Sequence, residues 1–433
     1  MMDFNILTLG CKVNQYESQA MREDLLRHGY VPSKDKEHAD ITIINSCTVT
    51  SVSDAKNRKL IHRVRRENPE GIVVLTGCMP QAFPEEMERF TECDIILGNK
   101  ERAKLIPAIE RFCVERNRLL DIPVHQNQGA LFESMTVSAF SEHTRAFIKI
   151  EDGCNRFCSY CIIPYARGRV RSKPLAELKA EIEVLASRGY REVVLVGINL
   201  SAYGQGEDFD LADAVEAACA VEGIARVRLG SLEPEQMTEP LIARLAAQPK
   251  FCPQFHLSLQ SGCDRTLKAM NRHYDSAEYM AIVDRLRAAF DNASVTTDVM
   301  VGFAGETGED FQASLNFVKS VGFAKVHVFP YSQRKGTRAA DAPDQVEPAE
   351  KERRAKVMGD LVEQSRRDFL TSQVGLTEEV LFERLRRGCL EGYTKNYTPV
   401  RVISNDSSLC GEVRQVRLVE VGKDCCMGEW IIE

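Results

Sequence analysis

The sequence predicts an α/β protein in three parts: a doubly wound parallel first domain, a partial (β/α)6 barrel and a small all-β barrel at the C-terminal end. Three observations support this prediction. The chain has 433 residues, more than the roughly 250–300 over which one core usually grows. Strands and helices alternate in two long series, and short alternating segments replace them after residue 371. We expect domains at residues 1–125, 140–370 and 373–433.

The composition is that of a globular protein without a membrane segment. Hydrophobic residues make up 44% of the chain and charged residues 27%. No apolar run approaches the roughly 18 residues of a membrane span, and no basic n-region of a secretory signal opens the chain. We therefore expect a cytoplasmic protein whose 15 cysteines serve as metal ligands or catalysts rather than as disulfides. The net charge of −7 argues against a general nucleic-acid coat but leaves room for a local basic surface.

In the first domain, apolar runs alternate with helical patterns. Four short runs predict strands, at residues 5–9, 41–45, 72–76 and 94–97. Helices are predicted between them, as at 15–29 and 54–67. This alternation is typical of a parallel, doubly wound sheet. The polar stretch 120–144 then predicts a linker with one short strand.

A second alternating series begins near Arg145. Six strands are predicted, at 146–150, 192–196, 225–229, 254–259, 295–301 and 325–329, with helices that include 175–187, 276–290 and 309–320. Thr307 and Asp310 predict a capping box at the start of the last of these helices. Six such strands suit an open, partial barrel. A charged helix at 347–371 follows, and short alternating segments from Thr377 onward predict a small antiparallel barrel.

The strongest motif is a short loop with three cysteines. Cys154, Cys158 and Cys161 form a C-x3-C-x2-C pattern directly after a predicted strand. Three thiolates on one loop can bind three irons of a cubane cluster and leave the fourth iron without a protein ligand. An open metal position is what chemistry requires, whereas structural sites use four ligands. The alternative is a zinc knuckle completed by a distant ligand, although zinc motifs favour paired C-x2-C halves.

Three further cysteines stand apart in the sequence but share one context. Cys11, Cys47 and Cys78 each follow a small residue at the predicted carboxyl end of a first-domain strand. In a parallel sheet those ends share one edge, where ligands bind. We therefore expect these thiols to converge. The alternative is three buried, inert thiols, because free cysteine is among the most buried residues.

Polar residues and glycines recur at the predicted carboxyl ends of the barrel strands, the face on which barrel active sites form. The candidates are Gly197, Asn199, Ser231, Glu233, Gln260 and Arg272. Taken singly, the polar ones are equally well explained as structural caps or salt bridges. The glycines of segment 298–307 would let backbone approach a ligand, but they are also ordinary turn chemistry.

The cysteine loop, with Tyr160 just before its third cysteine, resembles the signature of the radical S-adenosylmethionine (SAM) superfamily. The segments 8–18, 45–49 and 76–79, which carry the other three cysteines, resemble the N-terminal domain of the methylthiotransferase family. This resemblance implies two [4Fe-4S] clusters with six catalytic cysteine ligands. The loop cluster would chelate SAM and cleave it reductively to a 5′-deoxyadenosyl radical, and the auxiliary cluster would relay the methylated sulfur. SAM would be surrounded by Tyr160, Gly197, Asn199, Ser231, Glu233, Gln260 and Arg272, with Glu233 and Arg272 ranked first.

Two groups of residues are candidates for RNA binding. Arg167, Arg169 and Arg171 follow the cysteine loop and suit phosphates or a carboxylate, or else they hold the loop against the barrel. In the tail, Tyr393, Lys395 and Tyr397 suit base stacking and charge if they are exposed, and otherwise they are core residues. The tail resembles a TRAM domain, the RNA-binding tail of these enzymes, which favours the first interpretation.

The resemblance covers nearly the whole chain apart from the linker, and it implies a tRNA-modifying enzyme. It is strongest to the branch that converts threonylcarbamoyl-adenosine at tRNA position 37 to its 2-methylthio derivative. The alternatives are the branches acting on isopentenyl-adenosine in tRNA or on an aspartate of a small-subunit ribosomal protein, and a structural-metal RNA-binding protein without turnover. The implied partners are the tRNA anticodon stem-loop and an electron donor such as flavodoxin or ferredoxin. We expect a monomer, and the sequence leaves the sulfur source open.

Overall fold

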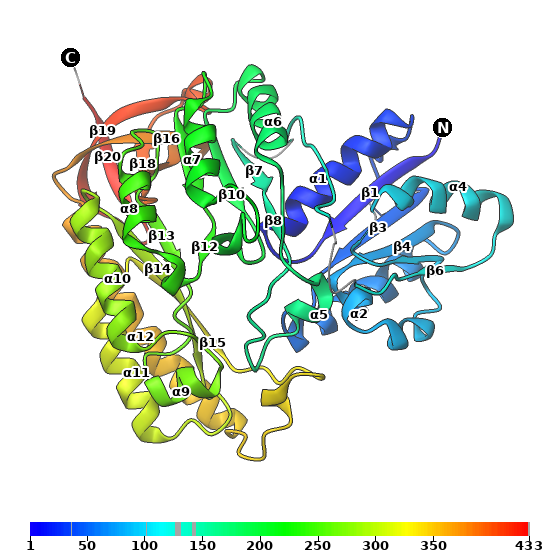
Figure 1. Cartoon of the computed structure of the whole chain (residues 1–433). Coiled ribbons are helices and arrows are strands. Elements are labelled where there is room, and N and C mark those ends of the chain that lie inside the picture. Colours follow the sequence, from blue (N-terminus) through cyan, green and yellow to red (C-terminus); the bar gives the residue numbers. More distant parts are fainter. Residues whose placement is uncertain (36, 101, 126–130, 141–143, 432–433) are drawn as a thin grey trace.

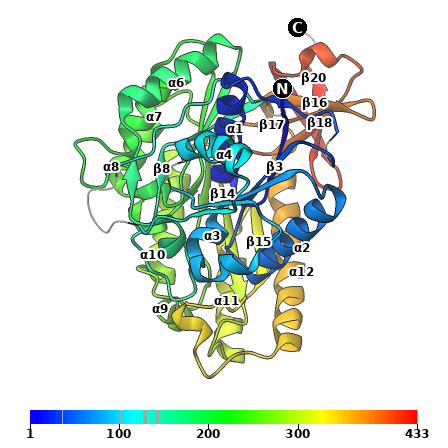
Figure 2. The same ribbon diagram turned by 90° about the vertical axis from the view of Figure 1, so that its right-hand side faces the viewer.

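The first part of the chain is a six-stranded sheet in which all neighbours pair in parallel, in the order β2-β1-β3-β4-β5-β6 (Figures 1 and 2). The computed structural model describes residues 1–35, 37–100, 102–125, 131–140 and 144–431. The elements of this part are β1 (Asp3–Thr8), α1 (Lys12–Arg27), β2 (Val31–Pro32), β3 (Ile41–Ser46), α2 (Ser51–Glu67), β4 (Ile72–Gly77), α3 (Cys78–Ala82), η1 (Pro84–Arg89), β5 (Ile95–Leu97), η2 (Arg102–Lys104), α4 (Leu105–Glu115) and β6 (Leu119–Asp121).

The central strands β3 and β4 are buried at every position, which explains why they read as unbroken apolar runs. One hydrophobic cluster lies on each face of the sheet, under α1 and α4 on one side and under α2 and α3 on the other. The doubly wound prediction is therefore confirmed. In the stretch expected as a linker, the described residues are held against α1, where Ser138 N donates to Glu23 Oε1 at 2.8 Å and Tyr16 donates to Met135 O.

The second part is a partial barrel built from two parallel sheets, in the orders β11-β10-β7 and β12-β13-β14-β15, with helices outside (Figure 1). All six expected strands are present, and the short β12 adds a seventh. The strands are β7 (Arg145–Lys149), β8 (Glu151–Asp152), β9 (Arg171–Ser172), β10 (Glu192–Val196), β11 (Arg226–Leu229), β12 (Ser231–Leu232), β13 (Gln254–Leu257), β14 (Ser294–Val301) and β15 (Lys325–Pro330). β8 and β9 form a separate antiparallel pair.

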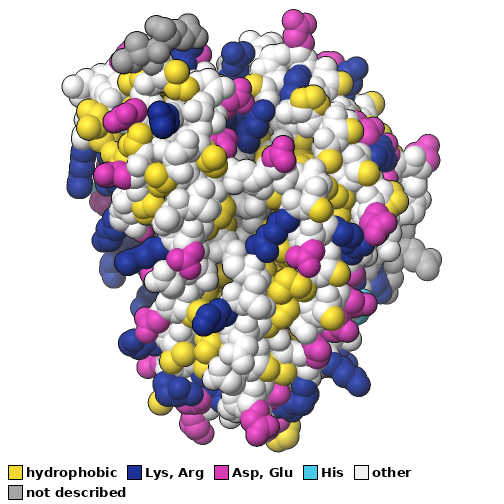
Figure 3. Space-filling model, turned by 90° about the vertical axis from the view of Figure 1, so that its left-hand side faces the viewer, with side chains coloured by type: hydrophobic (Ala, Val, Ile, Leu, Met, Phe, Trp, Pro, Cys, Tyr) yellow, Lys and Arg dark blue, Asp and Glu magenta, His cyan; other side chains and the backbone are white. Residues whose placement is uncertain are grey.

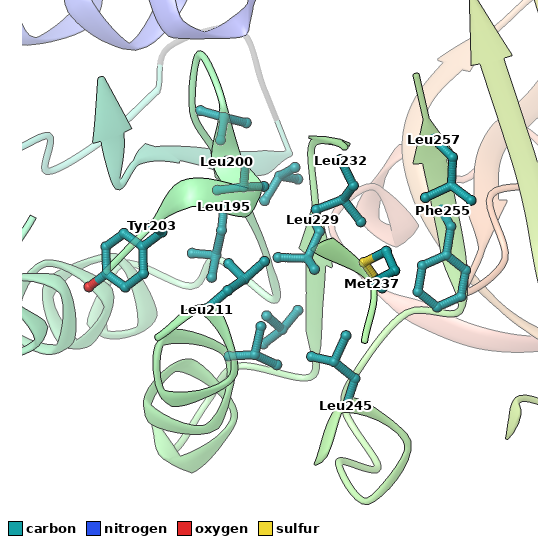
Figure 4. Packing of buried hydrophobic residues seen from close by; sticks show 14 of the residues in the cluster. Leu195, Leu200, Tyr203, Leu211, Leu229, Leu232, Met237, Leu245, Phe255 and Leu257 are labelled. Carbon is teal, nitrogen blue, oxygen red and sulfur yellow. The ribbon is translucent and has the colours of Figure 1, made fainter. Parts of the chain in front are cut away.

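The helices of this part are α5 (Ile163–Arg167), α6 (Leu175–Ser187), η3 (Leu200–Ala202), α7 (Leu211–Ala220), η4 (Pro234–Gln236), α8 (Glu239–Ala246), α9 (Asp264–Ala269), α10 (Ser276–Ala289), α11 (Gly308–Val321), η5 (Arg338–Ala340) and α12 (Pro348–Ser372). The expected capping box of Thr307 and Asp310 opens α11. Between strands and helices lies the largest core, in which Leu195, Leu229 and Phe255 pack with Leu245 of α8 (Figure 4). This continuous core makes the barrel a rigid support for its loops.

The tail is a closed five-stranded barrel in the order β16-β17-β18-β20-β19. Its elements are β16 (Thr377–Arg386), β17 (Cys389–Thr394), β18 (Pro399–Ile403), η6 (Ser407–Leu409), β19 (Val413–Val421) and β20 (Cys426–Trp430). The small barrel is confirmed, but the expectation that it is antiparallel throughout is wrong, because β18 and β20 pair in parallel to close it. A sequence of short alternating strands does not show which pair closes a barrel.

The tail is fixed to the amino-terminal ends of the barrel strands by buried arginines. Arg226 Nη1 donates to Tyr393 O and Arg228 Nη1 to Lys395 O, both at 2.9 Å. Both guanidiniums lie beside Glu192, with Arg228 Nε 2.8 Å from its Oε1. The tail therefore covers charged groups that would otherwise face water or remain without partners.

We expect removal of residues 373–433 to lower the midpoint of thermal unfolding by several degrees. Arg226 and Arg228 would lose carbonyl partners, and each hydrogen bond to a charged group contributes roughly 1.5–3 kcal/mol. Calorimetry of the full and shortened chains measures the change. Arg417→Ala, an exposed change on β19, serves as the control that should leave the midpoint unchanged. An unaltered midpoint in the shortened chain would contradict this account of the interface.

On the face shown in Figure 3, Lys and Arg side chains are interspersed with Asp and Glu. No helix in the described part of the chain is both long enough and apolar enough to span a membrane.

Candidate active site

The loop with Cys154, Cys158 and Cys161 lies between β8 and α5 and is held at both ends by backbone hydrogen bonds. Cys154 N donates to Gly168 O and Ser159 N to Met270 O, both at 3.0 Å. Burial, with smaller contributions from the neighbouring thiols Cys161 and Cys158, raises the pKa of Cys154 to about 12. The structure therefore brings the three thiols close enough to repel one another once they ionise, which is the setting in which a cation would bind them.

Arg272 and Glu233 lie beside this loop as an ion pair. Arg272 Nη1 is 3.4 Å from Cys158 Sγ, and its Nη2 contacts the Glu233 carboxylate. Nη2 also donates to Ser258 O at 3.0 Å, so the guanidinium is fixed between the loop and the strand ends. The structure thus brings Glu233 and Arg272, the two residues ranked first from the sequence, together beside Cys158.

Of the remaining SAM-site candidates, Tyr160, Gln260 and Asn199 line two cavities around the cysteine loop. Tyr160 and Gln260 line a cavity of about 170 Å³ with Cys161. Asn199 lines a second cavity of about 460 Å³, and its Oδ1 is buried without a hydrogen-bond partner. Gly197 lies against Glu151, where an added Cβ would stand 2.6 Å from the carboxylate, and Ser231 is exposed at the start of β12. The buried acceptor of Asn199 fits a ligand that donates a hydrogen bond into this mouth.

The first-domain thiols meet at the carboxyl edge of the sheet, as expected. Cys11 precedes α1, Cys47 follows β3, and Cys78 is the first residue of α3. Burial raises the pKa of Cys78 to about 12, with Arg167 lowering it and both Cys47 and Cys11 raising it. Gly10, at φ +119°, allows the close approach, because a Cβ there would lie 2.8 Å from Cys47 Cβ. The carboxyl ends of β1, β3 and β4 thus bring Cys11, Cys47 and Cys78 together.

The first domain also closes over the barrel mouth. Val49 and Thr50, just after Cys47, line the same 170 Å³ cavity as Tyr160 and Cys161. Arg334, in the loop after β15, fixes this arrangement through an ion pair with Asp54 at 2.5 Å and a hydrogen bond to the Thr48 hydroxyl at 2.7 Å. The cavity therefore lies between the cysteine loop and the segment that follows Cys47.

Of the three arginines expected at RNA phosphates, only Arg169 is exposed, with its guanidinium over the Phe157 ring at 5.0 Å. Arg167 is fully buried, so the prediction that it contacts RNA is wrong. Arg171 is 3.2 Å from Asp152 with a side chain 8% exposed, which corrects the prediction for this residue as well. Arg171 thus holds the loop against the barrel through Asp152, the alternative that the sequence left open, whereas Arg167 reaches mainly into the first domain, to Cys78 and Glu17.

The expectation that Tyr393, Lys395 and Tyr397 form an exposed stacking surface is also wrong. The two rings stack on each other at 4.4 Å, and the Arg145 guanidinium lies 5.2 and 5.0 Å from them. Lys395 pairs with Glu379 at 3.2 Å. All three residues are half-buried where the tail meets the strand starts, at the opposite end of β7 from the cysteine loop.

Sequence reasoning missed a buried charge network between the first domain and the barrel. Its centre is Glu17, whose carboxylate contacts Arg102 and Lys149 at 2.8 Å and also Arg167. Burial alone would raise the pKa of Glu17, but these three cations together lower it to about 2. Two signals were available: Lys149 stands alone in an apolar strand, and Glu17 lies three residues after Asn14, on the same face of the predicted helix.

The thiol sets fit clusters better than single ions. Among the described residues, no three Cys, His, Asp or Glu side chains are grouped closely enough to hold one metal ion. A cubane binds each thiolate through a different iron, so its ligands need not meet at a point. Three thiols that bind through separate irons therefore suit such a cluster at both places.

Comparison with known proteins gives two family matches. The model described as the radical SAM superfamily matches residues 148–318, and the one described as uncharacterized protein family UPF0004 matches residues 3–98. In fold, the chain is similar to the radical SAM methyltransferase TsrM of Kitasatospora setae, with a TM-score of 0.57 and 14% identity, covering 78% of this chain and 74% of that one.

Full-length relatives carry two kinds of name. Proteins named threonylcarbamoyladenosine tRNA methylthiotransferase MtaB are 35% identical in Bacillus subtilis (98% of this chain, 95% of the relative) and 36% identical in Thermotoga maritima (100% and 98%). A protein named tRNA-2-methylthio-N(6)-dimethylallyladenosine synthase in Caldicellulosiruptor saccharolyticus is 34% identical over 99% of this chain and 92% of its own length.

Proposed function

The chain belongs to the radical SAM family of tRNA methylthiotransferases, and from this premise we propose that it inserts a methylthio group at C2 of threonylcarbamoyl-adenosine just 3′ of the anticodon. The observation that carries the reaction is the cavity that Val49 and Thr50 share with Tyr160, Cys161 and Gln260. It puts the cysteine loop and the segment that follows Cys47 against one cavity, as the transfer of sulfur to a substrate radical formed at the SAM site requires. The substrate rests on the relatives named for threonylcarbamoyladenosine.

We assign the SAM cluster to Cys154, Cys158 and Cys161 and a second cluster to Cys11, Cys47 and Cys78. When bound, the first cluster and SAM would supply a carbon radical that removes the C2 hydrogen as 5′-deoxyadenosine, the second cluster would supply the sulfur, and a second SAM would supply the methyl group. The SAM site comprises Tyr160, Gly197, Asn199, Ser231, Glu233, Gln260 and Arg272. Arg272 donates toward the Cys158 thiolate and Glu233 offers a carboxylate to a cationic ligand. The apolar Met300, Phe329 and Tyr331 on the cavity wall exclude water from the reacting groups.

We assign the anticodon loop to the exposed surface beside the cysteine loop rather than to the tail tyrosines. Phe157 and Tyr165 meet edge to face at 5.9 Å, Tyr165 is 54% exposed, and Arg169 lies over Phe157. An exposed ring, Tyr165, and a half-buried one, Phe157, next to a guanidinium suit unpaired bases and their phosphates. An electron donor such as flavodoxin or ferredoxin, and a monomeric state, remain predictions from the family resemblance.

We expect Glu233→Gln to raise the KM for SAM about tenfold, because a charge-assisted contact to a cationic ligand becomes a neutral one. Steady-state formation of 5′-deoxyadenosine at varied SAM concentration measures it. Glu239→Gln is the matched control, since Glu239 is nearby in sequence and has a 77% exposed side chain that pairs with Arg285. Equal KM values for both variants would remove Glu233 from the SAM site.

The proposed substrate is tested by mass spectrometry of tRNA nucleosides from cells lacking this gene. We expect 2-methylthio-threonylcarbamoyl-adenosine to disappear and its unmethylthiolated precursor to accumulate. Complementation with the intact gene should restore the product, and complementation with Cys154→Ala should not. Loss of the 2-methylthio isopentenyl nucleoside instead would favour the second candidate substrate, which the dimethylallyl-named relatives support.

A further inference from the structure

Arg167 connects the two thiol sets directly. It ends α5, the helix that begins two residues after Cys161. Its Nε donates to Cys78 Sγ at 3.1 Å, and its Nη2 donates to Asn14 Oδ1 at 2.7 Å and to Glu17 Oε2 at 3.1 Å. One guanidinium from the cysteine loop's own helix thus reaches into the first domain and contacts a thiol there.

The position of this guanidinium is fixed from both sides. Asn99 Nδ2 and His125 Nε2 both lie within hydrogen-bond distance of Ala166 O at the end of α5. On the first-domain side, Asn14 Nδ2 donates to Leu9 O at 2.8 Å and to Ser46 O at 3.1 Å, next to Cys47. These contacts leave Arg167 little freedom, so the distance between Cys161 and Cys78 is held through one short helix.

The side chains joined to Arg167 by ion pairs, among the residues that the structure describes, include one more cation than carboxylate. They are Arg102, Lys149, Arg167 and Arg171, with Glu17, Glu133 and Asp152. A surplus of positive charge inside a protein is costly unless an anion lies nearby. A cubane core with two positive charges, held by three thiolates, carries one net negative charge and would balance it.

We propose that Arg167 is a positioning residue for the first-domain cluster, which holds the Cys78 thiolate by a hydrogen bond, supplies the balancing charge and fixes that thiolate relative to the SAM-cluster loop. The inference rests on the proposed function, since it takes Cys11, Cys47 and Cys78 as cluster ligands. A hydrogen bond and a positive charge at a ligand sulfur stabilise the reduced cluster and so raise its potential. Loss of Arg167 should therefore make the first-domain cluster harder to reduce.

The test uses full-length protein with Cys154, Cys158 and Cys161 changed to alanine, in which only the first-domain cluster can form. In this background we compare Arg167→Gln and Arg167→Lys with Arg169→Gln, an exposed residue of the same loop. Iron and sulfide are counted after anaerobic reconstitution. The midpoint potential is then measured by paramagnetic resonance during titration with dithionite and mediator dyes. We expect Arg167→Gln to lower the reduction equilibrium constant at least tenfold, about 59 mV for one electron, and Arg169→Gln to leave it unchanged.

The outcomes separate this inference from the proposed function. A parent protein that binds no iron would contradict the second cluster and hence the proposed function. A parent cluster whose potential is the same in both Arg167 variants would overturn the role of Arg167 and leave the proposed function standing. If Arg167→Gln does not fold, Arg167→Lys decides, because it keeps a cation for Glu17 but cannot reach three partners at once. A lowered potential in the lysine variant supports the inference, and an unchanged one overturns it.

Discussion

Alanine at Cys154, Cys158 and Cys161 is expected to reduce the formation of 5′-deoxyadenosine from SAM to the background of a protein-free reaction. The three thiols lie on one hydrogen-bonded loop, and Arg272 is 3.4 Å from Cys158 Sγ. Without them no open iron remains to chelate SAM or to pass it an electron. Anaerobic incubation with SAM and dithionite, followed by chromatography of the nucleosides, measures the loss.

The matched control replaces three half-buried cysteines outside both sets, Cys113, Cys389 and Cys410. We expect that variant to cleave SAM at the rate of the unaltered protein, because Cys113 packs on the first-domain core and Cys389 and Cys410 belong to the tail barrel. Cleavage that persists in the loop variant, or is lost equally in the control, would contradict the assignment of the SAM cluster.

Alanine at Cys11, Cys47 and Cys78 is expected to give the opposite pattern. SAM should still be cleaved to 5′-deoxyadenosine, whereas methylthio transfer to tRNA should stop. These thiols lie at the edge of the first-domain sheet, and none of them lines the cavity that contains Cys161. Their loss removes the proposed source of sulfur while leaving the Cys154–Cys161 loop and Arg272 in place.

This second variant is assayed by following both products in one reaction with tRNA. If it cannot cleave SAM although the loop cluster is present by iron analysis and absorbance, the division of roles between the two thiol sets is wrong. If it still forms methylthiolated tRNA, the sulfur comes from elsewhere. This variant also removes the contact between Arg167 and Cys78.

The parts of the fold that repeat a regular pattern were predictable from the sequence. Buried strands such as β3 and β4 appear as unbroken apolar runs, and Thr307 with Asp310 marks the start of α11 through a local interaction. The convergence of Cys11, Cys47 and Cys78 followed from strand direction alone, since parallel strands end at one edge. The closing pair β18–β20 depends on contacts between distant segments and left no such pattern.

Whether an individual polar side chain is buried, and what it contacts, was much less predictable from the sequence. Arg167 and Arg169 are two residues apart and chemically identical, yet one is fully buried at a thiol and the other is exposed. Which of them is buried depends on where Glu17 and Asn14 lie in another domain. Tyr393 and Tyr397 were misplaced for the same reason, because Arg145 and Arg228, which contact the rings, lie far away in sequence.

The most direct measurement of the central claim is turnover by the anaerobically reconstituted enzyme on three tRNAs that differ only at the adenosine 3′ of the anticodon. These carry threonylcarbamoyl-adenosine, isopentenyl-adenosine or plain adenosine, and mass spectrometry of the digested tRNA identifies the product. We predict a 2-methylthio product predominantly from the threonylcarbamoyl form. Preferential turnover of the isopentenyl form would contradict the substrate while leaving the reaction class intact. No methylthio product from any of the three, in protein that cleaves SAM, would contradict the account as a whole.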